Sequence, residues 1–171
     1  MRVILYMATT INGMIAKSDD DTNFVSNLEW KSFLSTIKGT GNMIIGRRTY
    51  HIMESKKEFS GMDDINIIVV TKNESLKTKN KNHFVVKSPK EALNLLEIQG
   101  FKEALVAGGG KLNASFMKDN LIDEIYIDIE PFVIGNGIKV FSDLNFENKL
   151  KLLNLKKLDK GLIQLHYKIL K

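Results

Sequence analysis

The sequence predicts an α/β fold with a mostly parallel central sheet, helices on both faces and an antiparallel hairpin at the C-terminal end. Short apolar runs alternate with segments of helical spacing through the first two thirds of the chain, which is typical of a parallel sheet covered by helices. From Ile125 onward apolar residues alternate with polar ones, which is typical of half-buried antiparallel strands.

The order of the elements follows from the same patterns. Runs of strand character cover residues 2–9, 14–16, 43–45, 65–70, 83–86, 103–107, 125–130, 150–158 and 162–170. Segments of helical spacing cover residues 28–37, 47–53, 89–98 and 111–119. The run at 2–9 lacks strict alternation, which indicates a central strand buried on both faces.

The helix ends carry recognisable capping residues. Ser26 or Asn27 can cap the first helix, and Gly39 with Gly41 is expected to end it. Residues 88–91, Ser-Pro-Lys-Glu, form a capping box with proline in the first turn. Both helices are therefore expected to begin at these positions.

The C-terminal hairpin has one alternative. Residues 149–160 alternate imperfectly, with a slip of phase between Leu152 and Leu153 that a β-bulge would produce. A basic amphipathic helix on a membrane surface is the other interpretation of this segment. The turn at residues 159–161 and the strand pattern at 162–170 favour the hairpin.

Composition limits the class of protein. With 171 residues, 43% of them hydrophobic, the chain is expected to form one domain over residues 1–171. It has no cysteine, which excludes thiolate zinc sites, disulfides and a cysteine nucleophile, and no metal site is expected. No apolar run suits a signal peptide or a membrane span, so a soluble, cytoplasmic protein without a membrane partner is expected. The lysines behind the net charge of +5 are scattered, so no nucleic-acid partner is expected.

Candidate binding residues follow the ends of the predicted parallel strands, where ligands of α/β sheets bind. They are Thr9, Thr10, Asn12, Gly46, Arg47, Arg48, Thr49, Thr71, Lys72, Gly108, Gly109, Gly110 and Lys111. Glycines between a strand and a helix leave backbone N–H groups at a helix N-terminus, which favours an anion such as a pyrophosphate. Arg47, Arg48 or Lys72 could receive a 2′-phosphate, so NADPH fits better than NADH.

Five segments together resemble a known family. They are residues 8–16, 45–50, 70–72, 106–112 and 131–137 with Phe141. They look like the dihydrofolate reductase superfamily, most closely the C-terminal reductase domain of the bifunctional riboflavin biosynthesis protein. The resemblance covers nearly the whole chain and implies a dihydrofolate reductase-like three-layer sandwich.

The resemblance also implies which residues bind the cofactor NADPH. In this family the arginine-threonine turn and the triple glycine bind its phosphates, the strand end near Thr71 binds the adenine-side ribose, and the first strand lines the nicotinamide. Carried over, the cofactor residues are Ala8, Ile15, Gly46, Arg47, Arg48, Thr49, Thr71, Lys72, Gly108, Gly109, Gly110, Lys111 and Leu112.

The expected substrate residues are Thr10, Asn12 and Asn27. Folate reductases place a carboxylate on the first helix, and Asn27 or Glu29 matches that position. The riboflavin branch usually has an aspartate where this chain has Asn12, which can donate a hydrogen bond but cannot act as a base. Glu29 is the expected proton donor, with loop aspartates or a water as alternatives.

The implied reaction is direct hydride transfer from NADPH to a small-molecule substrate. The riboflavin branch reduces a ribosylamino-pyrimidine phosphate, 5-amino-6-(5-phosphoribosylamino)uracil, to its ribityl form. The alternatives are a reductase of dihydrofolate or another pteridine, and a nucleotide-binding relative without catalysis. The resemblance and a free sheet edge also lead us to expect a homodimer.

Overall fold

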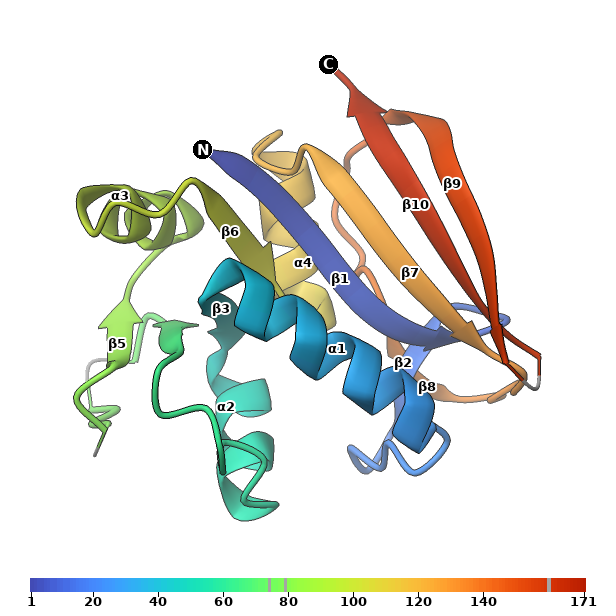
Figure 1. The fold of residues 1–171 in the computed structure, drawn as a ribbon, viewed down its shortest axis with the longest axis horizontal. Coiled ribbons are helices and arrows are strands. Elements are labelled where there is room, and N and C mark those ends of the chain that lie inside the picture. Colours follow the sequence, from blue (N-terminus) through green and yellow to red (C-terminus); the bar gives the residue numbers. More distant parts are fainter. Residues whose placement is uncertain (74, 79, 160) are drawn as a thin grey trace.

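The computed structural model describes residues 1–73, 75–78, 80–159 and 161–171. Within them, eight strands form one sheet in the order β5-β4-β3-β6-β1-β7-β10-β9, and β2 pairs with β8 separately (Figure 1). The strands are β1 (Arg2–Thr10), β2 (Met14–Lys17), β3 (Asn42–Gly46), β4 (Asn66–Val70), β5 (His83–Val86), β6 (Glu103–Val106), β7 (Glu124–Glu130), β8 (Gly137–Lys139), β9 (Lys149–Asp159) and β10 (Leu162–Leu170). Lys160, in the predicted closing turn, lies outside the described residues.

The sheet is mostly parallel, as predicted. Strand β1 pairs in parallel with β6 and β7, and β3 pairs in parallel with β4 and β6. Strand β10 is antiparallel to both β7 and β9. The chain therefore has the α/β fold with an antiparallel C-terminal hairpin that its sequence predicts.

One prediction about the last third of the chain is confirmed only in part. The alternation from Ile125 predicted a half-buried antiparallel strand, and β7 is antiparallel to β10 but parallel to β1, with its polar residues Asp128 and Glu130 buried. The alternation misled because the polar residues of β7 have partners inside the protein: Tyr6 of β1 donates to Asp128, and the backbone N–H of Ser26, the N-cap of α1, donates to Glu130. Buried polar groups with internal hydrogen bonds produce the same sequence pattern as exposed ones.

Four helices in the described residues cover the two faces of the sheet (Figure 1). They are α1 (Asn27–Thr40), α2 (Arg47–Ser55), α3 (Pro89–Ile98) and α4 (Gly110–Lys118). Successive side chains of β1 point to opposite faces. Val3 and Leu5 join a core with Phe116 of α4, whereas Ile4 joins a core with Ile37 of α1. The result is a three-layer arrangement with β1 buried in the middle.

The helix caps lie where the sequence places them. The Ser26 hydroxyl accepts a hydrogen bond from the Glu29 N–H at 3.2 Å, so Ser26 is the N-cap of α1. At the other end Gly41, with φ of +70°, donates its N–H to the Ile37 carbonyl, whereas Gly39, also expected to end the helix, lies within α1. The Ser88 hydroxyl caps α3 by accepting from the Glu91 N–H at 3.2 Å. These local signals fix the direction in which α1 and α3 leave the sheet.

The C-terminal hairpin contains the predicted bulge. His166 pairs with Asn154 and Tyr167 pairs with Leu152, which leaves Leu153 as the extra residue. The segment is thus a strand and not a membrane-surface helix. No helix in the described part of the chain is long and apolar enough to cross a bilayer.

A buried asparagine joins β3 to β6. The two strands pair through one residue pair, Ile44 with Val106. The Asn42 amide adds three hydrogen bonds, donating to the carbonyls of Thr40 and Glu103 and accepting from the Leu105 N–H. Asn42 therefore helps to hold the start of β3 against β6.

Candidate functional site

The triple glycine links β6 to α4. Gly108 has φ of +94° and is joined to Gly109 by a cis peptide bond, Gly109 is the N-cap of α4, and Gly110 begins the helix. A Cβ at Gly108 would meet the Met7 sulfur at 3.1 Å, and a Cβ at Gly110 would collide with the Lys139 carbonyl. Glycine is needed at both positions, for backbone conformation at one and for close approach at the other.

The N-termini of α2 and α4 lie side by side. The Gly46 N–H donates to the Gly108 carbonyl at 2.8 Å, and a Cβ at Gly109 would meet the Thr49 hydroxyl at 3.3 Å and Ile15 at 3.9 Å. Neither helix has a side-chain cap or an acidic residue in its first turn. The unpaired first N–H groups of two helices thus face one region, which favours an anion there.

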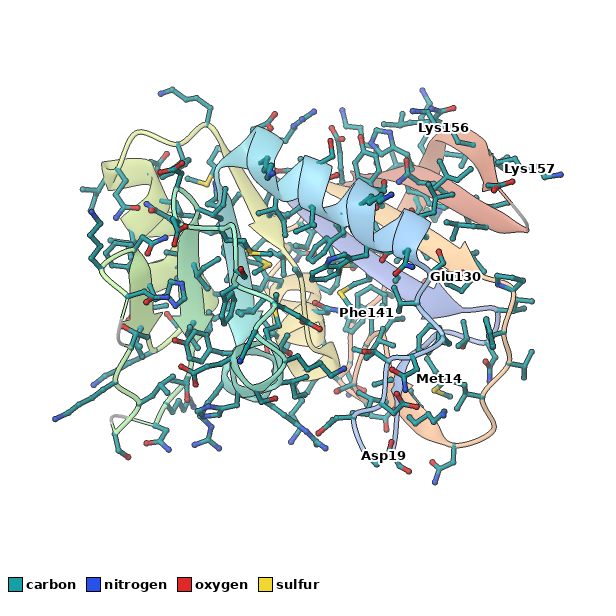
Figure 2. All side chains as sticks on the ribbon, turned by 60° about the horizontal axis from the view of Figure 1, so that its bottom comes forward. Met14, Asp19, Glu130, Phe141, Lys156 and Lys157 are labelled. Carbon is teal, nitrogen blue, oxygen red and sulfur yellow. The ribbon has the colours of Figure 1, made fainter. Side chains whose placement is uncertain are left out.

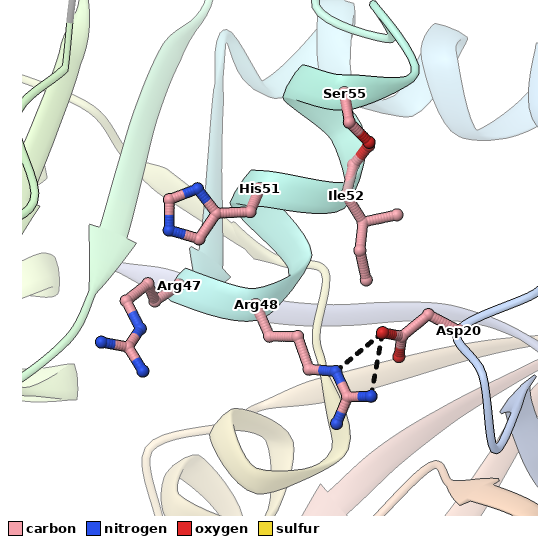
Figure 3. Close-up of a pocket in the computed structure, with 6 residues that line it drawn as sticks. All are labelled: Asp20, Arg47, Arg48, His51, Ile52 and Ser55. Atoms are coloured by element: carbon pink, nitrogen blue, oxygen red, sulfur yellow. Dashed lines mark hydrogen bonds and ion pairs between the residues drawn. The ribbon is translucent and has the colours of Figure 1, made fainter.

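Two arginines border this region. An open pocket of about 550 Å³ has Arg47, Arg48, His51 and Asp20 among its lining residues, which Figure 3 draws as sticks. The Arg48 guanidinium contacts the Asp20 carboxylate through Nε and Nη2, each at 2.9 Å. Arg47 is exposed and has no hydrogen-bond or ion-pair partner among the described residues. Arg47 is therefore available to an anionic ligand, and Arg48 would have to exchange Asp20 for one.

The end of β4 aligns with this junction. Val70 pairs with Gly46, so Thr71 and Lys72 follow at the same edge of the sheet. The Thr71 hydroxyl accepts the Asn73 N–H at 3.0 Å. Lys72 is exposed and lacks a partner in the described part of the chain. The predicted cofactor residues of β3, β4 and the triple-glycine turn thus share one edge.

Two other predicted cofactor residues, both in the first turn of α4, differ in what they expose. Lys111 is exposed. Leu112 is 7% exposed and packs in the core with Phe116, and its N–H donates to the Gly109 carbonyl at 2.9 Å. The structure places the Leu112 side chain beneath the junction, where it contacts the position a Gly46 Cβ would occupy.

A cluster of three buried carboxyl groups lies at the end of β1, under the first turn of α1. We call Glu29, Asp128 and Glu130 the acid cluster; they are 3%, 0% and 2% exposed. Asp128 pairs with Ala8 of β1, and Glu130 pairs with Thr10. Figure 2 shows Glu130 beside the N-terminal end of α1. The cluster is thus built from α1 and β7 beside the predicted nicotinamide residue Ala8.

Hydrogen bonds hold two members of the cluster. The Tyr6 hydroxyl donates to Asp128 Oδ2 at 2.7 Å, and the Ser26 N–H donates to Glu130 Oε1 at 2.7 Å. Burial, with added repulsion from Asp128 and Glu130, raises the pKa of the Glu29 carboxyl to about 8. Burial also raises the pKa of Asp128, and the Tyr6 hydrogen bond opposes that rise. Glu29 can therefore carry a proton near neutral pH.

The predicted substrate residues lie in two places. The Thr10 hydroxyl donates to Asn12 Oδ1 at 2.7 Å and accepts from the Met14 N–H at 3.0 Å. The Asn12 side chain bonds both the carbonyl and the N–H of Ile134, at 2.7 and 3.3 Å. Asn27 is the exposed first residue of α1. In this structure Thr10 and Asn12 hold the turn after β1, and Asn27 lies beside the acid cluster in sequence but faces solvent.

Sequence reasoning missed Tyr6, Asp128 and Glu130. Tyr6 and Asp128 are separated by 122 positions, so no local motif joins them. The available signal was the pair of acidic residues at alternate positions in an otherwise apolar strand, which the pattern assigned to a solvent face. Among the described residues, no group of three or more histidine, aspartate or glutamate side chains is arranged to hold a metal ion.

Comparisons with known proteins agree with this fold. The chain is 29% identical to the protein YwjB of Bacillus subtilis strain 168 over 97% of both chains. It superposes on a protein of Shewanella sp. PV-4 named for riboflavin biosynthesis with a TM-score of 0.82, 21% identity and complete coverage of both chains. The TM-score is 0.76 with dihydrofolate reductase from Enterococcus faecalis complexed with NADP(H), at 15% identity, covering 98% of this chain and 96% of that one.

A longer protein contains the same fold as one part. The diaminohydroxyphosphoribosylaminopyrimidine deaminase/5-amino-6-(5-phosphoribosylamino)uracil reductase of Thermotoga maritima matches 99% of this chain with 56% of its own, at a TM-score of 0.76 and 16% identity. These structural likenesses establish a dihydrofolate reductase-like fold. The family described as the RibD C-terminal domain matches residues 1–164. The chain belongs to the RibD C-terminal domain family.

Proposed function

We propose that the chain is an NADPH-dependent reductase of a pyrimidine- or pteridine-type substrate. The observation that carries the proposal is the hydrogen bond from the Gly46 N–H to the Gly108 carbonyl, which brings the N-termini of α2 and α4 together. Two uncapped helix N-termini beside Arg47 and Arg48 form a site for a ligand with several phosphates.

The residues present fit such a cofactor. The bare backbone at Gly109 leaves open the space between α4 and the Thr49 hydroxyl, which a Cβ would enter. The backbone N–H groups at the starts of both helices would bind the pyrophosphate, and Arg47, Arg48 or Lys72 the 2′-phosphate. When bound, NADPH supplies a hydride, and the chain orients it against the substrate.

The acid cluster contains a candidate proton donor for the reduction. Reduction of a C=N or C=O bond adds hydride at carbon and requires a proton at nitrogen or oxygen. Glu29, on α1, interacts electrostatically with Asp128, the β7 residue that pairs with the predicted nicotinamide residue Ala8, and Glu29 can hold a proton near neutral pH. We assign the proton-donor role to Glu29.

The substrate class has two candidates. Membership of the RibD C-terminal domain family supports a ribosylamino-pyrimidine such as 5-amino-6-(5-phosphoribosylamino)uracil. The buried carboxyl of Glu29 on the first helix favours a dihydrofolate or other pteridine ring, because folate reductases bind their ring with a carboxylate on that helix. Turnover assays that follow NADPH oxidation with each substrate separate these two.

The cofactor is tested by binding. We expect NADPH to bind more tightly than NADH. Replacing Arg47 and Arg48 with alanine should weaken NADPH binding about 10- to 100-fold, since a hydrogen bond to a charged group contributes about 1.5–3 kcal/mol, and should change NADH binding little. Lys157→Ala on the exposed strand β9 is the control. Failure of NADPH to bind, or equal binding by the arginine variants, would refute the proposal. NADPH binding without turnover of any pyrimidine or pteridine would support the non-catalytic alternative.

A further inference from the structure

The acid cluster brings Glu29 of α1 within electrostatic range of Asp128 and Glu130 of β7. Asp128 and Glu130 are two residues apart on β7 and therefore point to the same face of the sheet. The backbone N–H of Ser26, the N-cap residue of α1, donates to Glu130, and Glu29 lies in the first turn of α1. Glu29 is thus held over a pair of carboxyl groups fixed by the β1–β7 pairing.

The charges around Glu29 are all of one sign. The groups that face it are Asp128 and Glu130 from β7 and the Tyr6 hydroxyl from β1, which is bonded to Asp128. None of the three carboxyl groups forms an ion pair with a described residue. The Asp128 carboxylate also interacts with the side chain of Gln164, its register partner on β10.

Such an arrangement is costly unless a proton is retained. Carboxyl groups buried close together without a cation cannot all ionise, and one of them keeps its proton to a higher pH. The hydrogen bonds in the cluster decide which one this is. The Tyr6 hydroxyl donates to Asp128, which favours the charged form of Asp128, and the Ser26 N–H donates to Glu130 Oε1. Glu29 receives no hydrogen bond from a described side chain or loop N–H and is the member best suited to keep the proton.

We propose that Asp128 and Glu130 are positioning residues for the proton of Glu29, and that Tyr6 acts through Asp128 by keeping it ionised. The proposal rests on the proposed reductase function and deepens it, because it explains how a glutamate becomes the donor. In the reaction, the substrate C=N or C=O carbon accepts the hydride, and the electron pair of the π bond moves to the heteroatom. That atom takes the proton from Glu29, which is left as a carboxylate and is protonated again from water. The raised pKa of Glu29 agrees with this role.

The direct test measures the Glu29 carboxyl in the free protein. Protein labelled with carbon-13 at glutamate is titrated by NMR, and Glu29→Gln identifies the Glu29 side-chain resonance. We expect a Glu29 midpoint near pH 8 in the wild type. Asp128→Asn and Glu130→Gln should each lower the midpoint by about 1 pH unit, a tenfold change in the acid dissociation constant. Glu124→Gln on the same strand, whose carboxylate contacts His166 and Arg2 outside the cluster, should leave it in place.

A second variant keeps the test decisive if Asp128→Asn does not fold. Tyr6→Phe removes only the hydroxyl, so Asp128 becomes neutral more readily and the Glu29 midpoint should again fall. A Glu29 midpoint that does not change in Glu130→Gln and Tyr6→Phe would overturn the proposal, as would a wild-type midpoint near that of an ordinary glutamate.

An activity measurement separates this inference from the reductase assignment. With a substrate that turns over, the alkaline fall in rate should move to lower pH in Glu130→Gln, whereas a purely structural role would lower the rate equally at every pH. If NADPH does not bind, the reductase proposal fails, and the NMR titration still decides whether Asp128 and Glu130 hold the proton on Glu29. An alkaline limb that stays in place in Glu130→Gln would contradict the inference alone.

Discussion

Replacing Asn42 with alanine is expected to lower the free energy of unfolding by about 3–5 kcal/mol. The side chain is fully buried; its amide donates to the carbonyls of Thr40 and Glu103 at 2.9 Å each and accepts from the Leu105 N–H at 3.1 Å. Alanine would leave three backbone groups without these partners. Each buried unpaired group costs about 1–3 kcal/mol, and the costs of neighbouring groups are not fully additive.

Urea denaturation followed by circular dichroism measures the loss, which is large beside the roughly 5–15 kcal/mol that stabilises a typical domain. The control is Asn66→Ala. Asn66 is the register partner of Asn42 on β4, but its amide makes an exposed hydrogen bond to Gln99, so its removal should cost less than about 1 kcal/mol. If both substitutions cost the same, the Asn42 bridge between β3 and β6 does not contribute as described.

Three further predictions concern the junction, the acid cluster and the sheet edge. Gly110→Ala should destabilise the protein by about 1–3 kcal/mol, because the new Cβ would collide with the Lys139 carbonyl. The control Gly39→Ala, in open space within α1, should stabilise the protein by about 0.5–1 kcal/mol. Equal effects of the two substitutions in urea denaturation would contradict the close packing at Gly110. Folding raises the pKa of Glu29 from 4.5 to about 8, so the folded state binds this proton more tightly, and the stability that the proton contributes is lost as pH rises between these values, by up to about 1.4 kcal/mol per pH unit. Glu29→Gln should remove this part of the pH dependence of the free energy of unfolding. Plots of that free energy against pH that run parallel for wild type and variant would contradict the prediction. We also propose that the chain forms a homodimer through the exposed edge strand β9, where Leu152 and Leu155 are 48% and 56% exposed. Changing both leucines to aspartate should yield a monomer in light-scattering measurements of molecular mass. A wild-type protein that is itself a monomer would refute the dimer.

The parts of the fold that follow from nearby residues could be predicted. Ser26 and Ser88 cap their helices because a cap is decided within one helical turn, and the extra residue Leu153 shows in the sequence as a local slip of phase. The direction of β7 could not be predicted this way. Whether its alternate face meets water or α1 depends on a helix about 100 positions earlier, which periodicity within β7 does not record.

The same distinction explains the candidate site. The glycines at 108–110 and the arginines after Gly46 are local signals, and the structure brings both to one edge of the sheet. The acid cluster depends on contacts such as Tyr6 with Asp128, which no spacing rule connects. Asn12 shows the opposite case, since a residue type suited to binding substrate forms hydrogen bonds to the Ile134 backbone.

The end of β1 contacts both the triple-glycine turn and the acid cluster. Met7 points to the α4 side of the sheet and packs where a Cβ of Gly108 would lie, while its neighbour Ala8 pairs with Asp128. Adjacent residues of a strand are only about 3.3 Å apart and point to opposite faces. The end of β1 therefore lies between the triple-glycine turn and the acid cluster, with one on each side of the strand. A substitution that shifts β1 by one residue against β7 would exchange these faces and disrupt both sites together.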